Sequence, residues 1–382
     1  MIYLDNAATS FPKPPCVTEE MARCMRQYCG NPGRGSHRLA MEAAEKIFEC
    51  RTAISSFFGS NNPENVIFTM NATMALNIAI KGLLRQGDHV LISDMEHNAV
   101  LRPVHRLAQK GKITYDVFPS MAERSDASGV RICAGIARLI KPQTRMLICS
   151  HASNICSYRA PLEEIGAFCK RHRILFVVDA AQSAGHFPID IEKMQIDALC
   201  APGHKGLLGP QGSGFLIFGE GIVAETLMEG GSGYHSLDAD MPTEAPERYE
   251  AGTLSTPAIV GLGAGLGEVK RMGMEALSHH IESLNQRLQN QLLELPGITV
   301  YTPHHVGSVL LFNIDGMAAD RVGSELDRLG FGVRAGFHCA ALGHSTLGTP
   351  QGGAVRVSPG IFNTRAHIDA FSSAVEMIAR RK

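Results

Sequence analysis

Residues 174–182, Ile-Leu-Phe-Val-Val-Asp-Ala-Ala-Gln, join an apolar run to a carboxylate and an amide. The first five residues are apolar without interruption, which is typical of a strand that is buried on both faces of a sheet. Such strands occur mainly in parallel sheets, because crossover helices cover both faces. Asp179 and Gln182 follow at the point where the strand would end. The segment therefore predicts a parallel sheet with polar side chains beyond the carboxyl end of this strand.

Similar apolar runs occur on both sides of this segment. They cover residues 66–69, 90–93, 113–118, 146–150, 199–201 and 215–218. Segments with the length and pattern of helices lie between the earlier runs, at residues 73–84, 98–110, 130–140 and 162–171. Strands that alternate with helices favour an α/β fold in which helices cover a mostly parallel sheet. We therefore expect a large domain built on a mostly parallel, seven-stranded sheet.

The length and the change of pattern along the chain predict a second domain. With 382 residues, 45% of them hydrophobic, the chain exceeds what one compact core usually serves. After about residue 255, Thr256-Pro257 combines a capping hydroxyl with a proline at the first helical position. Strands are then predicted at residues 309–313, 332–334 and 355–357, and helices near residues 318–328 and 364–380. We predict a large domain over residues 15–255 and a smaller α/β domain over residues 256–382.

The composition excludes several classes of function. Thirty-six basic against thirty-seven acidic residues leave the charge near neutral, without the positive field that nucleic-acid binding requires. No apolar stretch approaches the roughly 20 residues that span a bilayer, and no basic segment precedes an apolar run at the N-terminus. The ten cysteines include no C-x-x-C pair, so we expect reduced thiols and no metal site. These features predict a soluble, cytoplasmic protein.

Two residues indicate a particular cofactor. A carboxylate at the tip of a buried strand, such as Asp179, is costly to bury unless a partner compensates its charge. A positively charged ring nitrogen would serve, and so would a structural salt bridge. Lys205 lies between His204 and Gly206, just after the predicted strand at residues 199–201. A lysine desolvated there has a lowered pKa and can form a Schiff base with an aldehyde. Together, Asp179 and Lys205 favour pyridoxal phosphate.

The chain also contains a candidate phosphate site. The predicted strand at residues 66–69 leads through Met70, Asn71 and Ala72 into a helix that begins near Thr73. The free N–H groups at a helix N-terminus, together with the helix dipole, bind phosphate. An ordinary strand–helix turn, capped by Asn71 or Thr73, would have the same sequence. Both interpretations are open from the sequence.

Several motifs resemble those of class V aminotransferase-fold enzymes and, more narrowly, those of the cysteine desulfurase and selenocysteine lyase family. The matching motifs are Tyr3-Leu-Asp-Asn-Ala-Ala-Thr9, Glu96-His-Asn-Ala99, His151-Ala-Ser-Asn154, Asp179-Ala-Ala-Gln182, Gly203-His-Lys205, Glu250-Ala-Gly-Thr253 and Arg334-Ala-Gly-Phe-His-Cys339. The matches run in order from residue 3 to about residue 364, nearly the whole chain. The resemblance implies a pyridoxal-phosphate-dependent transferase fold of type I. In such a fold residues 15–255 would bind the cofactor and residues 1–14 would pack near the active site.

The resemblance also implies which residues contact the cofactor. Lys205 would carry the cofactor and act in catalysis, and His97, a second catalytic residue, would stack on the cofactor ring. Asp179 would pair with the ring nitrogen. The phenolic oxygen would be bound by Asn154 with Gln182 beside it, and the phosphate by Ala72, Thr73, His204 and, across a homodimer interface, Thr253. Two positions depart from the family pattern: Pro202 stands where many relatives have serine, and Ala72 where threonine is frequent. The loss of two hydroxyls puts the affinity for the cofactor in question.

Three residues are expected to contact the substrate, and one more to react with it. Arg356 looks like the arginine that binds the substrate carboxylate, a role that suits a planar, bidentate guanidinium, and Ala7 and Asn154 would lie beside the substrate. Cys339 matches the family's catalytic cysteine, and His338 or the cofactor could lower the pKa of its thiol. The alternative for Cys339 is a buried free thiol without a catalytic role.

The predicted reaction is that of a cysteine desulfurase. Alanine would be released from L-cysteine, and a persulfide would be left on Cys339 for an acceptor protein or thiol. A selenocysteine lyase is the first alternative, because selenium is the better leaving group and needs less help from Cys339. Another class V lyase or aminotransferase reaction is the second, and a cofactor-free binding scaffold is the third. The scaffold conflicts with the presence of Lys205, Asp179 and His97 together.

Overall fold

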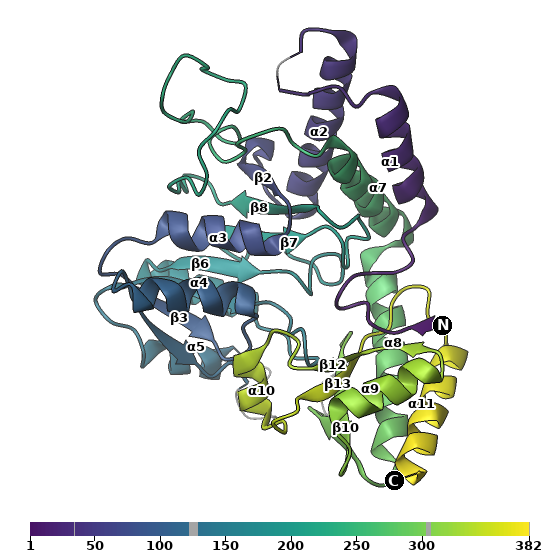
Figure 1. Ribbon diagram of the computed structural model, residues 1–382. Coiled ribbons are helices and arrows are strands. Elements are labelled where there is room, and N and C mark those ends of the chain that lie inside the picture. Colours follow the sequence, from purple (N-terminus) through teal and green to yellow (C-terminus); the bar gives the residue numbers. More distant parts are fainter. Residues whose placement is uncertain (34, 122–128, 303–306, 382) are drawn as a thin grey trace.

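A seven-stranded sheet is the framework of the larger part of the molecule (Figure 1). The computed structural model of the chain describes residues 1–33, 35–121, 129–302 and 307–381. Across the sheet the strands lie in the order β2 (Val66–Thr69), β8 (Gly214–Phe218), β7 (Ala198–Pro202), β6 (Leu175–Asp179), β5 (Thr144–Ser150), β3 (His89–Ser93) and β4 (Thr114–Phe118). Every strand predicted for this part of the chain is present, with its ends shifted by a residue or two. The predicted α/β fold is confirmed.

The direction of the strands also agrees with the prediction, with one exception. Strands β4, β3, β5, β6 and β7 run parallel, whereas β8 is antiparallel to its neighbours β7 and β2. Parallel neighbours need a long crossover, usually a helix. The described residues 203–213, which connect β7 to β8, form turns and bends and no helix. Strand β8 therefore returns directly beside β7 in the opposite direction.

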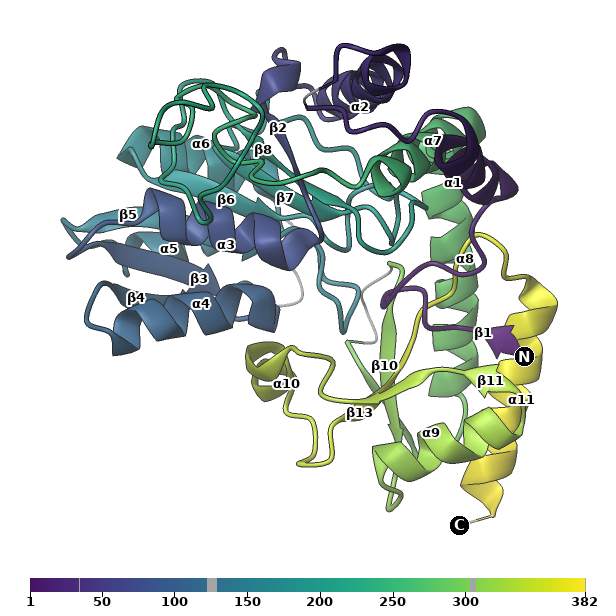
Figure 2. The same cartoon turned by 45° about the horizontal axis from the view of Figure 1, so that its top comes forward.

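Helices cover both faces of this sheet (Figure 2). Helices α3 (Ala72–Leu83) and α4 (Asn98–Gln109) pack on one face, and α2 (Arg38–Phe57), α5 (Val130–Ala137), α6 (Leu162–His172) and α7 (Thr256–Met272) contribute to the core on the other. In strand β6, Val177 belongs to the first core and Phe176 and Val178 to the second, and none of the three is exposed. Because both faces are buried, the strand needs apolar side chains at every position.

Two long N-terminal helices were not predicted, and the second of them also contacts β2. Helix α1 (Pro15–Gln27) and helix α2 both pack against α7. Val17 and Cys24 are the buried residues of α1, so the apolar pattern of this helix is too sparse to recognise in the sequence. None of the helices in the described residues is both long and apolar enough to cross a membrane.

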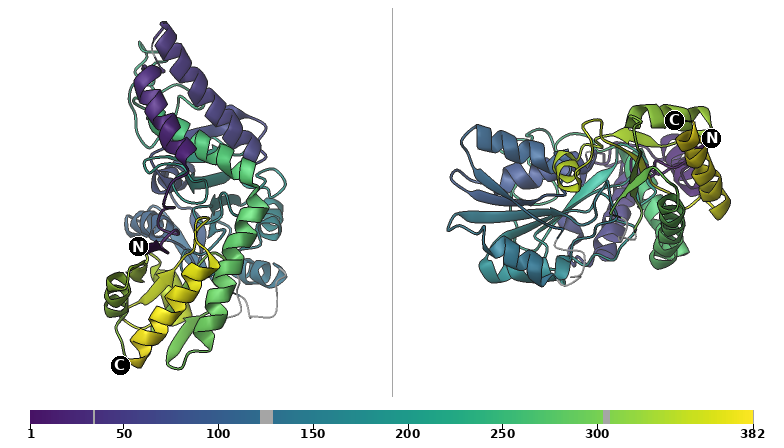
Figure 3. Two further views of the ribbon diagram at one scale, coloured as in Figure 1. Left: turned by 90° about the vertical axis from the view of Figure 1, so that its right-hand side faces the viewer. Right: turned by 90° about the horizontal axis from the view of Figure 1, so that it is seen from below.

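The smaller part of the molecule is built on a four-stranded antiparallel sheet (Figure 3). Its strands lie in the order β12 (Arg334–Gly336), β13 (Ala354–Val357), β10 (Leu310–Ile314) and β9 (Ile298–Tyr301). Its core is formed together with α8 (Met274–Leu293), α9 (Ala319–Arg328) and α11 (Arg365–Arg380), while α10 (Ala341–Leu347) lies between β12 and β13 in the chain. Strand β9 and helices α8 and α10 were not predicted.

The strand predicted at residues 332–334 is wrong in its extent. Two short strands occupy this region: β11 (Phe331–Gly332) pairs with β1 (Ile2–Tyr3), and β12 pairs with β13. The chain leaves one sheet and enters the other at Val333. Because the two partners come from opposite ends of the sequence, no local pattern could have separated the two strands.

The N-terminal segment, residues 1–14, extends from the small part of the molecule to the loop after β7. Its strand β1 pairs with β11. The N–H of Ala7 donates to Oγ of Ser358 at 2.9 Å, and the N–H of Ser10 donates to the carbonyl of His204 at 3.0 Å. The first residues of the chain therefore contact the loop that carries Lys205.

Candidate active site at the carboxyl ends of the large sheet

A pocket of about 250 Å³ lies at the carboxyl ends of the parallel strands, where open α/β sheets bind ligands. Residues that follow β2, β3, β5, β6 and β7 line it, together with residues of the N-terminal segment and of the small part. It contains nearly all of the predicted site residues, namely Ala7, Ala72, Thr73, His97, Asn154, Asp179, Gln182, His204, Lys205, Cys339 and Arg356. Thr253 is the exception. The tertiary structure thus brings together residues from five strand ends and from both ends of the chain.

Asp179 and Lys205 provide a buried carboxylate and a reactive amine. Asp179 ends β6 and is 4% exposed. Its Oδ1 accepts a hydrogen bond from the N–H of Ala181 at 2.8 Å. Burial raises the pKa of this carboxyl, against the opposite effects of that hydrogen bond and of Lys205. Burial lowers the pKa of Lys205 to about 8, although the charge of Asp179 opposes the shift. Among the described residues, none forms a hydrogen bond or ion pair with Nζ of Lys205, so this amine is free to react with a carbonyl group.

His97 contributes a neutral ring to the pocket. It caps α4, and its Nδ1 accepts a hydrogen bond from the N–H of Ala99 at 3.0 Å. Because Nδ1 is the acceptor, neutral His97 carries its proton on Nε2. Burial, with the positive charges of Lys205 and Arg356, lowers the pKa of His97 to about 4. The imidazole is therefore uncharged at neutral pH and can stack on a flat, aromatic ligand.

The turn from β2 into α3 brings the N-terminus of a helix to the pocket. Asn71 is the cap of α3, because its Oδ1 accepts a hydrogen bond from the N–H of Met74 at 2.9 Å. Ala72 and Thr73, the first two residues of the helix, line the pocket. The hydroxyl of Thr73 is not used for capping, so it is available to a ligand. His204 adds a buried Nδ1 that has no hydrogen-bond partner among the described residues.

Arg356, in the middle of β13, is held from two sides. One of its terminal nitrogens lies 2.7 Å from Oδ1 of Asp5, and the other donates to the carbonyl of Asn154 at 3.0 Å. Its Nε is buried and has no partner in the described part of the chain. Oδ2 of Asp5 lies 3.2 Å from Nε of Arg334, a second arginine of the pocket. Sequence analysis gave no role to Asp5 or Arg334, although both lie in motifs that it quoted.

The loop that carries Cys339 is held at two consecutive carbonyl groups. Nδ2 of Asn154 donates to the carbonyl of His338 at 2.8 Å, and the N–H of Asn98 donates to the carbonyl of Cys339 at 2.7 Å. His338 and Cys339 both have left-handed backbone conformations, with φ of 51° and 55°. Cys339 is exposed and lines the pocket. The loop is therefore confined, with the thiol accessible from the pocket.

His338 is not placed to activate this thiol. Its Nε2 lies 3.1 Å from the carbonyl oxygen of Arg334 and its Nδ1 lies 3.2 Å from Nε2 of His344. Both ring nitrogens are therefore occupied, and neither is free to accept the proton of Cys339. Burial, with the positive charge of Arg356, lowers the pKa of His338 to about 3. The expectation that His338 could lower the pKa of the Cys339 thiol is thus not supported by the structure.

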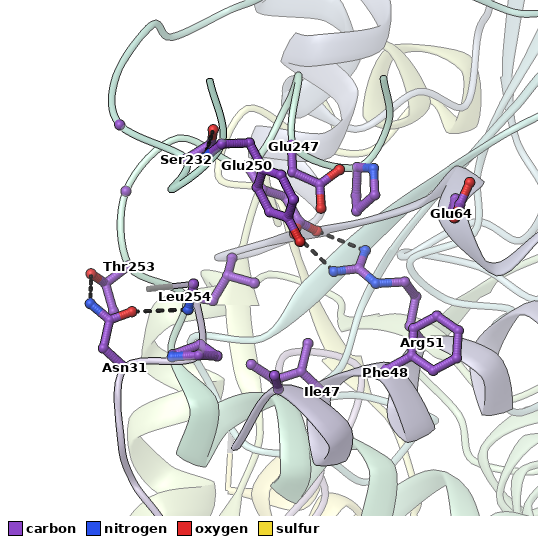
Figure 4. A pocket seen from close by; sticks show the side chains of 17 residues that line it. Asn31, Ile47, Phe48, Arg51, Glu64, Ser232, Glu247, Glu250, Thr253 and Leu254 are labelled. Atoms are coloured by element: carbon purple, nitrogen blue, oxygen red, sulfur yellow. Dashed lines mark hydrogen bonds and ion pairs between the residues drawn. The ribbon is translucent and has the colours of Figure 1, made fainter. Parts of the chain in front are cut away.

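Thr253 lies in a separate hollow of about 600 Å³ (Figure 4). Its Oγ1 lies 3.5 Å from Nδ2 of Asn31. Close by, the buried Arg51 of α2 makes two hydrogen bonds to Glu250, at 2.9 and 2.8 Å. Glu250 also accepts a hydrogen bond from the N–H of Phe68 at 2.6 Å. These contacts fix the chain before Thr253 against α2 and β2, at a distance from the pocket of the same molecule that contains Lys205.

Glu96 is a buried residue that sequence analysis quoted in a motif without giving it a role. It has no exposed surface and accepts hydrogen bonds from the hydroxyl of Ser93 and from the N–H and hydroxyl of Ser150, the latter two at 2.7 and 3.0 Å. Burial raises the pKa of this carboxyl to about 8, and the nearby Asp179 adds to the shift. Glu96 thus joins the ends of β3 and β5 directly before His97.

Comparisons with known proteins show the family and the fold to which this chain is similar. The family model "Aminotransferase class-V" matches residues 2–371. The chain is 33% identical to a "Probable cysteine desulfurase" of Methanothermobacter thermautotrophicus, over 99% of this chain and 94% of the relative. It is also similar to the apo structure of a cysteine desulfurase from Thermococcus onnurineus NA1, with a TM-score of 0.89, 30% identity and coverage of 100% and 95% of the two chains. A cysteine desulfurase structure from Escherichia coli has a TM-score of 0.88 and 26% identity, with coverage of 99% and 94%.

Proposed function

The chain belongs to the class-V aminotransferase family, and from this premise we propose that it is a pyridoxal-phosphate-dependent cysteine desulfurase. One observation carries the proposal: an exposed thiol, Cys339, lines the same pocket as the amine of Lys205 and the buried carboxylate of Asp179. A lysine and a carboxylate alone would serve any enzyme of this cofactor class. The cysteine in the same pocket adds a nucleophile that can accept sulfur.

The residues present fit pyridoxal phosphate. Asp179 would hold the ring nitrogen, Lys205 the aldehyde carbon, and His97 one face of the ring. The phosphate would lie at the N-terminus of α3, against Ala72 and Thr73, where N–H groups and the helix dipole favour an anion. The buried Nδ1 of His204, which has no partner among the described residues, would gain one there. Asn154 and Gln182 would lie beside the phenolic oxygen.

Thr253 would reach the phosphate of a second copy of the chain. Its hollow, lined by residues of α2 and of the chain before α7, is separate from the Lys205 pocket. In a dimer in which the Lys205 pocket of one copy faces the hollow of the other, each copy would supply Thr253 to the phosphate site of its partner. A homodimer is therefore part of the proposal.

The substrate would be held by its carboxylate. Arg356 offers its buried Nε, which has no partner in the described part of the chain, while Asp5 and Asn154 fix its other two nitrogens. Ala7 and Asn154 line the same pocket and would limit the space around the substrate. L-cysteine suits this site, because its carboxylate would pair with Arg356 and its sulfur would extend toward Cys339.

Two residues would carry out proton and sulfur transfer. When bound, pyridoxal phosphate stores the electron pair left on the substrate carbon. Lys205, displaced by the substrate amine, would take the Cα proton, a task that its lowered pKa suits. The Cys339 thiolate would then attack the substrate sulfur: the new S–S bond forms, the C–S bond breaks, and the electron pair passes to the carbon, which gains a proton. The products are alanine and a Cys339 persulfide, whose outer sulfur an acceptor thiol would remove.

The proposal is tested by measuring alanine release from L-cysteine and from L-selenocysteine, with the wild-type protein and with Cys339→Ala. We expect the wild type to release alanine from L-cysteine and the variant to lose this activity. Release of alanine from L-selenocysteine alone, unchanged in the variant, would instead identify a selenocysteine lyase. Full activity toward L-cysteine in Cys339→Ala would overturn the persulfide step.

A further inference from the structure

Two buried histidines lie directly behind the loop that carries Cys339. The rings of His338 and His344 are nearly parallel, with an interplanar angle of 13° and 5.4 Å between centroids. They are 8% and 3% exposed. Nδ1 of His338 lies 3.2 Å from Nε2 of His344, and Nδ1 of His344 lies 2.8 Å from Oγ1 of Thr349. We call His338 and His344 the histidine pair.

The hydrogen bonds of the histidine pair can have only one direction. The carbonyl of Arg334 can only accept, so Nε2 of His338 carries a proton. A neutral His338 then accepts at Nδ1, so Nε2 of His344 must donate. Nδ1 of His344 is left as an acceptor for the hydroxyl of Thr349, whose oxygen lies 2.8 Å from this nitrogen and 3.3 Å from the carbonyl oxygen of His344. Each group therefore donates to the next in a single direction: Thr349 to His344, His344 to His338, and His338 to the backbone carbonyl of Arg334 in β12.

The surroundings keep both rings neutral. Burial lowers the pKa of His338 to about 3, and the positive charges of Arg356 and Arg334 favour the same shift. Burial also lowers the pKa of His344, and the ring of Phe337 packs edge-on against it. The hydrogen bonds of the histidine pair therefore join two neutral rings, and neither ring takes up or releases a proton to form them.

The hydrogen bonds from Thr349 through His344 to His338 support an unfavourable backbone conformation. His338 and Cys339 are consecutive residues in the left-handed region, which is unfavourable for residues other than glycine. Such conformations persist only where the surrounding structure fixes them. Asn154 and Asn98 hold the two carbonyl groups, but these bonds do not fix the ring of His338. The ring is held at both nitrogens, by the carbonyl of Arg334 at Nε2 and by His344, which supplies the donor to Nδ1.

We propose that His344 is a positioning residue for Cys339, which holds the ring of His338 so that the strained loop presents the thiol to the pocket. This inference rests on the proposed function. It gives a role to α10, whose residue His344 touches neither the substrate nor the cofactor site. It also explains why both ring nitrogens of His338 are occupied: the pair restrains the loop and does not accept the proton of the thiol.

The test compares His344→Phe with His344→Gln in the purified holoenzyme. Phenylalanine keeps a flat ring but has no N–H, whereas glutamine can place an amide N–H near the position of Nε2. With His344→Phe we expect kcat for alanine release from L-cysteine to fall by about 100-fold, as expected when a reacting group is displaced by about 1 Å. KM should stay unchanged, because Arg356 is untouched. His344→Gln should recover most of kcat. Thr349→Val removes only the hydrogen bond from the Thr349 hydroxyl to His344 and should lower kcat by less than His344→Phe does.

Hydrogen exchange provides a readout that needs no catalysis. In His344→Phe the amides of residues 335–343 should exchange faster than in the wild type, while those of β10 and β13 should not change. His344→Gln should restore the slow exchange. The proposal would be overturned if His344→Phe changed neither kcat nor the exchange of residues 335–343. It would also be overturned if the Phe and Gln variants lost the same share of kcat while exchange in β10 and β13 stayed as in the wild type.

The failure of this proposal can be distinguished from failure of the proposed function. If the wild type releases no alanine, the desulfurase proposal fails, but exchange in residues 335–343 still tests whether His344 holds the loop. If His344→Phe also speeds exchange in β10 and β13, the fold itself is affected. The comparison of Thr349→Val with the wild type then decides: faster exchange confined to residues 335–343 supports the proposal, and unchanged exchange there overturns it.

Discussion

Replacing Arg51 by methionine would leave the carboxylate of Glu250 buried without its cation. The two side chains are 5% and 6% exposed, and two hydrogen bonds join them. Arg51 also donates to the carbonyl of Val66 and lies over the ring of Phe68 at 4.7 Å. Methionine has a similar length and is apolar, so the substitution removes the charge and its hydrogen bonds while leaving most of the packing volume filled.

The expected loss of stability is large. Removing one partner of a buried ion pair costs about 3–5 kcal/mol, because the other charge is left uncompensated. The carbonyl of Val66 loses a donor as well, and a buried acceptor without a partner costs about 1–3 kcal/mol. We therefore expect Arg51→Met to lower the free energy of unfolding by about 5 kcal/mol at pH 8.

The loss should depend on pH in a defined direction. Burial already raises the pKa of Glu250 above its usual 4.5, and Arg51 opposes that shift. Without Arg51 the pKa in the folded state rises further, whereas in the unfolded state it stays ordinary. A group with a raised pKa in the folded state stabilises the fold only while it is protonated, so the folded variant loses stability as the pH rises above 4.5. The difference between variant and wild type should be smaller at pH 5.5 than at pH 8.

Urea unfolding at fixed protein concentration measures this difference. In the double variant Arg51→Met with Glu250→Leu the buried charge is absent, so the loss relative to the wild type should no longer grow from pH 5.5 to pH 8. Part of the loss should remain, because the N–H of Phe68 and the carbonyl of Val66 are both left unpaired, at about 1–3 kcal/mol each. Arg23→Met is the surface control: the exposed side chain of Arg23 pairs with Glu20 within α1, and such pairs contribute about 0.2–1 kcal/mol. A loss below about 1 kcal/mol for Arg51→Met at pH 8, or one that does not change with pH, would refute the reasoning.

Three further predictions concern the candidate active site. Absorbance can follow the rate at which the apoprotein combines with pyridoxal phosphate. We expect this rate to rise about tenfold per pH unit below pH 8 and to level off above it, because only neutral Lys205 reacts. A rate that does not change with pH would contradict this. Asp5→Asn should raise KM for L-cysteine by about tenfold with less effect on kcat, because Asp5 orients Arg356 at 2.7 Å; an unchanged KM would show that Asn154 suffices. Thr253→Val should weaken cofactor binding by about tenfold or more, since a hydrogen bond to a charged group contributes about 1.5–3 kcal/mol, and equal affinity in a protein that is still dimeric by sedimentation would remove Thr253 from the phosphate site.

The candidate site could be predicted to a large extent because its residues follow a simple order in the chain. Each buried parallel strand is an uninterrupted apolar run, and the polar residues of the pocket follow the ends of these runs, as Asp179 follows β6 and Lys205 follows β7. The carboxyl ends of parallel strands necessarily meet at one edge of a sheet. The motif resemblance then added Arg356 and Cys339, which the strand pattern alone could not connect to that edge.

Other features depend on contacts between distant segments and were missed. Helix α1 has few buried residues, and residues 332–334 divide between two sheets whose partner strands lie at opposite ends of the chain. His344 lies on the short helix α10, and its proposed role follows only from its distance to His338. His338 or the cofactor was expected to lower the pKa of the thiol, and the structure does not support this for His338, because both of its ring nitrogens are occupied.

The sequence by itself determined which segments become buried strands and which polar residues stand at their ends, because burial on both faces imposes a short-range pattern that can be read directly. Only the tertiary structure decided how those ends meet the small sheet, which nitrogen of Arg356 stays without a partner, and that Thr253 lies in a hollow apart from Lys205. These properties depend on the packing of segments hundreds of residues apart in the chain, such as Asp5 against Arg356, and the pattern within one segment carries no information about its distant partner.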